Sequence, residues 1–201
     1  MNAYATHLLI VVLVCAATWF LFIYFWPRLL LSVFKRALLV RGFGEGPIPL
    51  NTLYTQPLQL FAEPLSAQSA SSSNLMTVGV NHDTLVTVAW LDLAKEPLVL
   101  HVPAMDARYY SVQFTNPAHN TNFAYVGTRA TGSQAGDYLI SGPAWRGSPP
   151  AGMPHIAAPN SAVLVLARVL VYSDGDLEAA YALSKQFQLA PLSRWQPAAR
   201  T

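Results

Sequence analysis

The chain has 201 residues, of which 53% are apolar and only 11% are charged. This length fits one membrane segment and one soluble domain of roughly 160 residues, which is large enough to bury a hydrophobic core. The formal net charge of +2 lacks the basic excess of a nucleic-acid-binding surface, so we expect no nucleic-acid partner. The single cysteine, Cys15, excludes an intramolecular disulfide, and the soluble part has no thiolate nucleophile or cysteine-based zinc site.

The N-terminal segment predicts a membrane-spanning helix. Residues 8–26 contain no charged residue, glycine or proline. A helix of that length measures about 28 Å, close to the ~30 Å hydrocarbon core of a bilayer. Trp19, Tyr24 and Trp26 lie toward one end, where aromatic rings anchor at the interface. A cleaved signal peptide is the alternative, but its apolar core is shorter, about 7–15 residues, and follows a positive charge. We therefore expect a retained single-pass anchor with the lipid bilayer as a partner.

Pro27 predicts the end of the span or the first position of a new helix. Residues 28–39 place leucine and phenylalanine side chains on one side of a helix and Lys35 and Arg36 on the other. This pattern predicts either an interfacial helix at the lipid headgroups or a helix that packs on the soluble domain. Four basic residues follow the span and none precedes it, which by the positive-inside rule favours a cytoplasmic domain. These residues are Arg28, Lys35, Arg36 and Arg41.

The chain divides into three predicted parts. Residues 1–40 form the transmembrane anchor and interfacial helix, residues 41–74 a loop or linker, and residues 75–201 a β domain. The middle part is rich in glycine and proline at first, and then in serine.

Short strands are predicted within the last part. Residues 98–102 and 110–115 alternate with a period of two, so that one face of each strand is buried. Residues 131–136 predict a hairpin connection between strands near 122–128 and 137–141. Residues 162–172 are apolar on both faces, as in a central strand. A C-terminal helix capped by Ser173 or Asp174 is predicted to follow, and Pro191 ends it.

Several segments, taken in order and with their spacing, resemble the domain-of-unknown-function family twelve fifty-four. They are NHDTL at 81–85, WLDLAKEPLVLHV at 90–102, residues 103–110, NFAYVGTRATG at 122–132, GDYLISGPAWRG at 136–147, Arg168 after an apolar run, and residues 176–192, ending in QFQLAPL. Two positions depart from the family pattern: Val86 stands where a tyrosine is frequent, and the Asn-rich loop reads NPAHNTN.

The resemblance implies a mainly β fold, a jelly-roll-like β-sandwich. Together with the patterns above, we expect this sandwich to carry one N-terminal transmembrane helix and a C-terminal helix. The resemblance also implies a bacterial protein of the cell (inner) membrane, with the soluble domain on the extracytoplasmic side, contrary to the charge bias. In many relatives a second β domain, domain of unknown function twelve fourteen, follows this one. We expect that companion on a separate chain. The family has no established catalytic residues to transfer.

Arg168 lies inside the apolar strand predicted at 162–172. A buried guanidinium must be paired, and the predicted partners are Asp83, Asp106 and Asp137. Such a pair would fix the strand register, or it would serve as an anion or carboxylate clamp.

A second group of polar residues flanks the predicted hairpin. Arg129 and Asp137 are predicted to pair across it. His119, Asn120 and Asn122 form a polar loop that could line the mouth of a pocket, although Asx turns also explain asparagine there. The histidines at 82, 101, 119 and 155 lack metal-ligand spacing, so no metal, cofactor or catalytic residue is predicted.

Two functions are consistent with these patterns. The first is a non-catalytic module that binds a partner β domain of the companion type, or a membrane complex, near the membrane surface. The second is an enzyme or small-molecule receptor with a pocket lined by Arg129, Asp137, Arg168 and the loop at 119–122.

Overall fold

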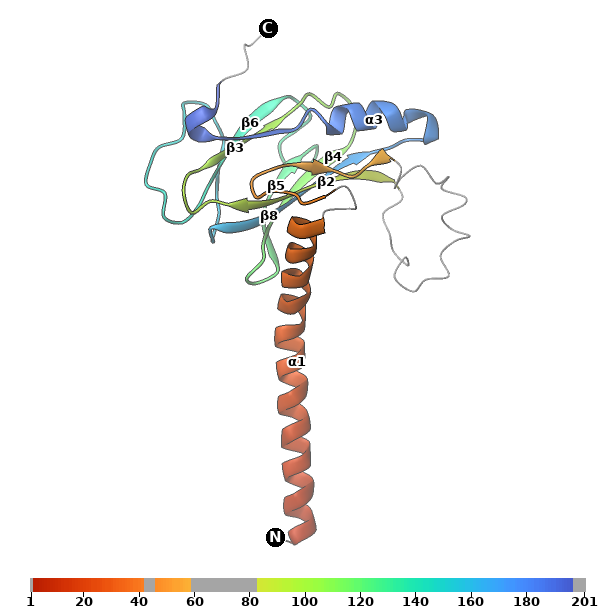
Figure 1. Cartoon of the computed structure of the whole chain (residues 1–201), viewed down its shortest axis with the longest axis vertical. Helices are drawn as coiled ribbons and strands as arrows, with labels where there is room; N and C mark the ends of the chain where they lie inside the picture. The colour runs from red at the N-terminus through yellow and green to blue at the C-terminus, as the bar shows by residue number, and fades with distance from the viewer. Residues whose placement is uncertain (1, 42–45, 59–82, 197–201) are drawn as a thin grey trace.

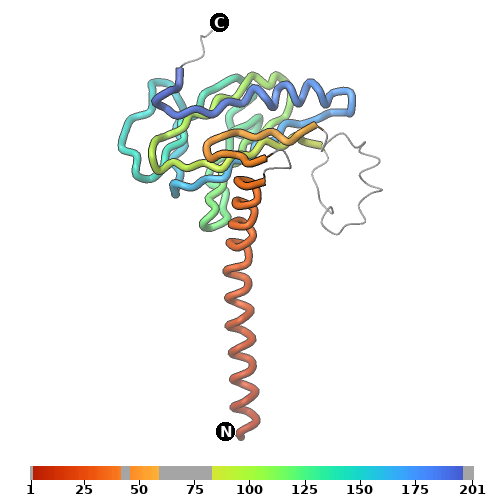
Figure 2. Tube along the Cα trace, viewed as in Figure 1, coloured from red at the N-terminus to blue at the C-terminus, as the bar shows by residue number. Residues whose placement is uncertain are grey.

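A long helix stands on one side of a β domain in the computed structural model, which describes residues 2–41, 46–58 and 83–196. The C-terminal end of this helix, α1 (Ala3–Arg41), meets the domain (Figure 1). The last described residues lie on the opposite side of the domain from α1 (Figure 2). The domain therefore has a face toward the helix and a face away from it.

Two sheets make up the domain. The first has five antiparallel strands, in the order β1 (Tyr54–Thr55), β2 (Thr84–Asp92), β8 (Ala162–Leu170), β4 (Tyr110–Asn116) and β5 (Thr121–Gly127). The second has the order β7 (His155–Ala157), β6 (Gly136–Ser141), β3 (Leu98–Val102) and β9 (Gln188–Pro191), with β6 and β7 parallel. Three short helices follow β8 or β9: η2 (Asp174–Asp176), α3 (Leu177–Ser184) and η3 (Leu192–Arg194).

Period-two alternation builds the core between the two sheets. Strand β2 turns Leu85, Ala89 and Leu91 toward the second sheet, where they join one buried cluster with residues such as Leu100 and Ile140. The alternation predicted for residues 98–102 and 110–115 is present: the inward side chains of β3 and β4 are buried in this cluster. Strand β8 is the middle strand of the first sheet, as its apolar sequence predicts.

The outer face of the first sheet receives the end of α1. A second buried cluster combines Leu38 of α1 and Ile48 with Val88 and Trp90 of β2 and Leu164 of β8. The Lys35 ammonium lies 5.1 Å from the centre of the Trp90 ring. Of the two predicted roles for residues 28–39, the structure thus shows packing on the domain, because the helix covers apolar side chains that the sheet turns outward.

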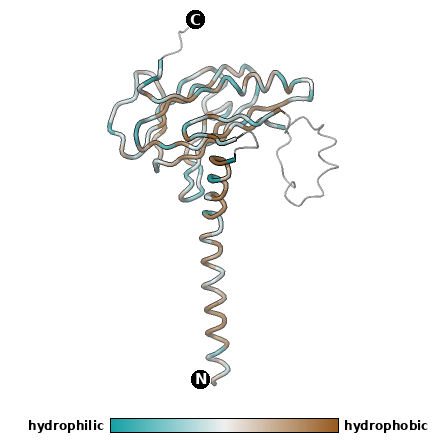
Figure 3. The backbone as a smooth tube through the Cα atoms, in the orientation of Figure 1, coloured by the Kyte–Doolittle hydropathy of each residue, from teal (hydrophilic) through white to brown (hydrophobic). Residues whose placement is uncertain are grey.

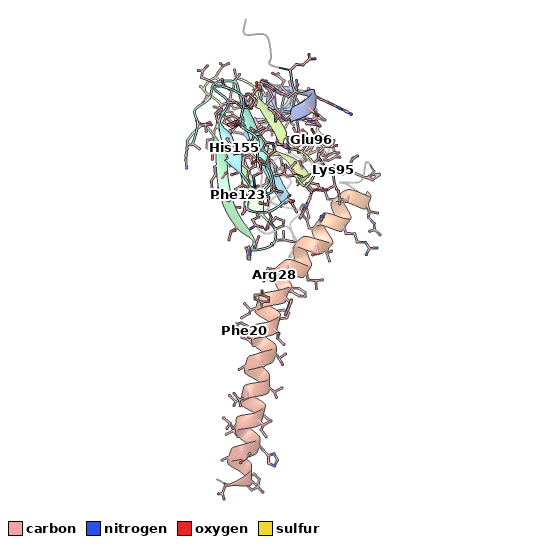
Figure 4. The ribbon with its side chains drawn as sticks, turned by 90° about the vertical axis from the view of Figure 1, so that its left-hand side faces the viewer. Phe20, Arg28, Lys95, Glu96, Phe123 and His155 are labelled. Atoms are coloured by element: carbon pink, nitrogen blue, oxygen red, sulfur yellow. The ribbon has the colours of Figure 1, made fainter. Side chains whose placement is uncertain are left out.

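Helix α1 continues through Pro27, where the sequence predicts a break. Proline removes one helical N–H and crowds the preceding turn of the helix. When the residues before and after the proline are strongly apolar, we expect the helix to bend there and not to end. The helix bends near the labelled Arg28 (Figure 4). Arg28 stabilises this turn, because its Nη1 donates a hydrogen bond to the Tyr24 carbonyl at 2.6 Å.

Most of α1 before the bend is apolar, and its N-terminal part extends away from the domain (Figure 3). By length and composition, α1 is one helix that could cross a membrane, and none of its most apolar stretch is buried within the protein. A soluble core helix would be covered by other elements, and this helix is not.

The predicted hairpin between residues 122–128 and 137–141 is wrong. Strand β5 belongs to the first sheet and pairs with β4, whereas β6 belongs to the second sheet and pairs with β3 and β7. The connection therefore passes from one sheet to the other. Turn residues predict that the chain reverses, but they do not determine which strand receives it.

The predicted C-terminal helix is shorter than expected. Helix α3 ends at Ser184, and Gln188–Pro191 forms β9, which pairs with β3. The pairing of β9 with an otherwise open edge of β3 outweighs the helical pattern of the sequence. Ser173 precedes η2 without a capping hydrogen bond from its side chain.

Part of the predicted linker belongs to the β domain. Within residues 41–74, Tyr54–Thr55 forms β1, and the Asn51 side chain accepts a hydrogen bond from the Asp92 N–H at 2.7 Å. The predicted domain boundary at residue 75 lies outside the described residues, and so does His82.

Candidate functional site

A histidine–aspartate pair lies on the outer face of the second sheet. His101 of β3 and Asp137 of β6 are direct cross-strand partners, so their side chains project from the same face. The His101 Nδ1 and the Asp137 Oδ1 are 2.7 Å apart. The two side chains are 26% and 21% exposed, which leaves the pair accessible to a ligand.

A groove of about 290 Å³ opens beside this pair. Val99 of β3 and Ala190 of β9 contribute apolar walls, and the polar lining comes from Gln188, Arg194 and Gln196. The indole of Trp195 completes the lining. The groove lies on the sheet that is farther from α1 (Figure 1).

The segment that carries Arg194 and Trp195 is fixed to the domain. The Leu192 N–H donates to the Pro97 carbonyl at 2.9 Å, and the Ser193 hydroxyl donates to the Glu96 carboxylate at 2.6 Å. Residues 95–97 lie between β2 and β3, so the groove wall is tied to the same strand that supplies His101. This arrangement positions the Arg194 and Trp195 side chains at the rim of the groove.

The chemistry of the groove is that of polar recognition. The carboxylate of Asp137 occupies one ring nitrogen of His101 and leaves Nε2 for a ligand. Arg194 offers a planar set of N–H donors, and Trp195 offers an apolar surface with one donor. The groove can thus hold a carboxylate or amide group against an aromatic ring.

A second histidine contact lies on the same sheet. The Ser141 hydroxyl of β6 and the His155 Nε2 of β7 are 2.8 Å apart, and the Trp145 ring meets the His155 ring edge-on. Ser141 is only 3% exposed, which denies a substrate access to its hydroxyl. Among the described residues, no acidic side chain pairs with His155, and no group of three His, Cys, Asp or Glu could hold a metal ion.

The structure does not bring the six predicted binding residues into one pocket. Asp137 lines the groove on the second sheet. His119 and Asn120 lie in the β4–β5 loop beside α1. Asn122 lies on β5, where its amide oxygen accepts from the Thr115 hydroxyl at 2.7 Å.

Arg168 is exposed, which corrects the prediction of a buried guanidinium. Strand β8 turns Ala167 and Val169 into the core and Arg168 outward, and α1 covers only the other end of that outer face. Within the described part of the chain, Arg168 forms no ion pair with the predicted aspartates. A strand whose sequence is apolar on both faces is therefore mostly buried, but single positions on it, such as Arg168, can be exposed.

The predicted pairing of Arg129 with Asp137 is also wrong. Arg129 is exposed, and its guanidinium lies 5.5 Å from the Tyr109 ring centre. Asp137 instead pairs with His101. Arg129 follows β5 of the first sheet and Asp137 lies in β6 of the second, so the chain does not place them across a hairpin.

The most complete ion pair was not anticipated from the sequence. Arg108, just before β4, makes two hydrogen bonds to the Asp176 carboxylate, at 2.5 and 2.6 Å. Its Nη1 also donates to the Leu170 carbonyl at 2.7 Å. The Arg108 hydrogen bonds lower the pKa of Asp176 to about 2, although burial acts in the opposite direction. The same contact with Asp176 raises the pKa of Arg108.

Tyr172 makes further contacts around this ion pair. The Tyr172 N–H donates to Asp176 Oδ2 at 2.9 Å, and the Tyr172 hydroxyl donates to the Ala107 carbonyl at 3.1 Å. The Arg108 guanidinium also lies 5.0 Å from the Tyr172 ring centre. These contacts tie β8 and η2 to the start of β4. The buried Arg108 Nε has no hydrogen-bond partner among the described residues.

These features define a class of protein: a two-sheet β domain with a short C-terminal helix, preceded by a long apolar helix. The chain belongs to the family described as "Protein of unknown function (DUF1254)", whose model matches residues 63–191. The predicted family is confirmed.

Two solved structures are similar to this chain. The crystal structure of the VPA0106 protein from Vibrio parahaemolyticus shares 23% sequence identity over 89% of this chain, with a TM-score of 0.61. A crystal structure of an uncharacterised protein from Burkholderia cenocepacia shares 13% identity over 73% of this chain, with a TM-score of 0.43. The match covers 40% of the Vibrio chain and 36% of the Burkholderia chain. No curated protein is significantly similar to this chain.

The Vibrio structure supports the fold. At this identity it carries no information on ligands or partners, and this chain spans less than half of the solved protein. A mainly β fold with an N-terminal apolar helix and a C-terminal helix, as predicted, is confirmed.

Proposed function

We propose that this protein is a single-pass membrane protein whose β domain binds a partner protein through its second sheet. The main support for this proposal is the groove, which places Trp195 and Arg194 beside the His101–Asp137 pair. Tryptophan and arginine are the side chains that most often dominate the binding energy of protein interfaces. Exposed apolar helix α1 supplies the anchor, and the groove lies on the sheet that faces away from it.

The partner in this proposal is a β domain of the companion type, domain of unknown function twelve fourteen, or a membrane complex that contains one. Strand β9 supports a β partner, because among the described residues it pairs with β3 alone and has no strand on its other edge. An open edge can pair with a strand of another chain. The proposal includes a jelly-roll-like relationship of the two sheets and an extracytoplasmic position of the domain.

Site-specific photo-crosslinking in native membranes tests the proposal. A photoreactive amino acid at Gln188, in the groove, should yield one discrete protein adduct. The same probe at the exposed Glu178 of α3, away from the groove, should yield none. Trp195→Ala should lower the Gln188 adduct by about thirtyfold, which is the effect of losing a contact worth about 2 kcal/mol.

Equal adducts at Gln188 and Glu178 would overturn the proposal, and so would an adduct that Trp195→Ala leaves unchanged. The second candidate, a small-molecule receptor or enzyme, draws on the oriented His101 imidazole. It would gain support from a small molecule that the purified protein retains in native mass spectrometry and that His101→Gln releases.

A further inference from the structure

A second groove, separate from the one on the second sheet, lies between α1 and the β4–β5 loop. It has a volume of about 340 Å³ and is lined by Phe20, Ile23, Tyr24 and Arg28 of the helix and by His119 and Asn120 of the loop. Strands β4 and β5 extend toward α1 in Figure 1, and their connecting loop reaches the helix below its docking point on the sheet. The β domain thus touches α1 at two separate levels.

The position of this groove along α1 is informative. The uncharged stretch of residues 8–26 ends two residues before Arg28, a rise of about 3 Å along a helix. In a helix that spans a bilayer, Arg28 then lies at the level of the lipid headgroups, and Phe20 and Ile23 lie in the outer hydrocarbon. The groove therefore crosses the boundary between the two.

The groove lining has an apolar lower part and a polar upper part. Phe20 is 68% exposed and Ile23 is 54% exposed, and together they give the lower part an apolar wall. Arg28, His119 and Asn120 give the upper part hydrogen-bond donors and one permanent positive charge (Figure 4 labels Phe20 and Arg28). No acidic side chain is among the lining residues, so the charge is not neutralised inside the groove.

Both polar walls are held in place. The Arg28 guanidinium lies 3.8 Å from the Tyr24 ring centre and donates to the Tyr24 carbonyl, which leaves other N–H donors of the group for a ligand. The β4–β5 loop is fixed by Asn116, whose side-chain oxygen accepts from the Ala118 N–H at 3.0 Å and from the Asn160 amide at 2.7 Å. A preformed site of this kind loses little entropy on binding.

We propose that this groove binds one anionic phospholipid, with its phosphate at Arg28 and His119 and the start of an acyl chain against Phe20 and Ile23. The inference depends on the membrane insertion of α1 proposed above. It goes further, because it assigns a lipid class to a site that combines the helix with the β domain. A bound lipid would connect the β4–β5 loop to the membrane surface.

Lipid retention by the full-length protein tests this proposal. The protein is reconstituted into nanodiscs of phosphatidylcholine with a minor share of phosphatidylglycerol, released into mild detergent and measured by native mass spectrometry. We expect phosphatidylglycerol to be enriched about tenfold in the retained lipid. Arg28→Gln should return the enrichment to the bulk ratio, whereas Arg28→Lys should keep part of it.

Arg36→Gln is the matched control, because Arg36 is an exposed cation on the same helix and does not line the groove. It should leave the enrichment unchanged. A phosphatidylglycerol probe with a photoreactive headgroup gives a second readout. Its adducts should include the peptide that carries His119 and Asn120, and inorganic phosphate should not displace it.

Membrane flotation and resistance to alkaline extraction, measured first, separate the two proposals. A protein that fails these tests contradicts the anchor itself. A protein that passes them, yet retains both lipids at the bulk ratio or responds equally to Arg28→Gln and Arg36→Gln, overturns the lipid site alone. Displacement of the probe by inorganic phosphate would overturn the assignment to a lipid.

Discussion

At the residue scale, Arg108 and Asp176 form a bidentate ion pair in the β domain. It joins the start of β4 to the end of β8 and to η2, whose bonded residues lie 62 and 68 positions further along the chain. Both side chains are mostly buried, with exposures of 12% and 19%. Charge-assisted bidentate pairs of this kind are about twice as strong as neutral hydrogen bonds.

Asp176→Asn should lower the free energy of unfolding by about 2 kcal/mol at neutral pH, because it removes hydrogen bonds to a charged group. The folded-state pKa of Asp176, about 2, lies below the ordinary aspartate pKa of 3.8. The carboxylate therefore stabilises the fold fully above about pH 4 and less as the pH falls toward 2. Denaturant unfolding of the full-length protein in detergent, at several pH values, measures this.

The pH dependence distinguishes the ion pair from a general effect of charge. The difference between wild type and Asp176→Asn should shrink as the pH is lowered from about 4 toward 2. Asp174→Asn, two residues away at an exposed position, is the control and should change stability little. A constant difference across this range, or an equal effect of Asp174→Asn, would contradict the interpretation.

At the element scale, the end of β5 is where the chain leaves the first sheet. Gly127 has a φ of +155°. A Cβ atom there would lie 2.6 Å from the Tyr110 carbonyl oxygen and 2.9 Å from the Ser111 Cα, both backbone atoms of the neighbouring strand. The close approach of β4 and β5 at this point therefore requires a glycine.

Gly127→Ala should destabilise the protein by about 3 kcal/mol, from backbone strain and from the clash with β4. Gly132→Ala separates the two causes, because Gly132 has a φ of +87° but open space around its Cα. Only the conformational cost applies there, about 1 kcal/mol. Thermal unfolding of both variants measures the difference in destabilisation. Equal destabilisation by Gly127→Ala and Gly132→Ala would show that the clash with Tyr110 contributes nothing.

The docking of α1 on the first sheet depends on Leu38, which is 2% exposed. Leu38→Ala should weaken this contact by about 2–3 kcal/mol through lost burial and a residual cavity. Amide exchange should then become faster at Ile48, whose N–H donates to the Leu38 carbonyl, while the β4–β8 ladder is unaffected.

Val40→Ala is the control for this change, because Val40 lies in the same turn of α1 and is 61% exposed. It should leave exchange at Ile48 unchanged. Faster exchange throughout the β domain after Leu38→Ala would mean that the helix stabilises the whole fold, contrary to the local role expected here.

At the scale of the whole molecule, the side of the membrane that the β domain occupies is open to a direct test. Cys15 is the only cysteine, so Cys15→Ser provides a cysteine-free background. A new cysteine at the exposed Ser148 should react with a membrane-impermeant maleimide in intact cells if the domain is extracytoplasmic, as proposed. Asn2→Cys should react only after lysis, and the reverse pattern would establish the cytoplasmic orientation that the positive-inside rule favours.

The sequence alone predicted the features that depend on local pattern. The uncharged run of residues 8–26 predicts the apolar helix, since no soluble element needs so long an uncharged segment. Alternation at 98–102 and 110–115 predicts which side chains enter the core, because side chains of a strand alternate between its faces. The order of several weak motifs was enough to identify the family, because their spacing is constrained jointly.

Only the tertiary structure decided which distant residues meet. Asp137 pairs with His101 and not Arg129, because β6 joins the second sheet while β5 stays in the first. Arg168 is exposed because α1 covers only part of the outer face of β8. Residues 188–191 form β9 because β3 offers an edge to pair with. Such outcomes depend on strand pairing between segments far apart in the chain, and local sequence pattern carries little information about that choice.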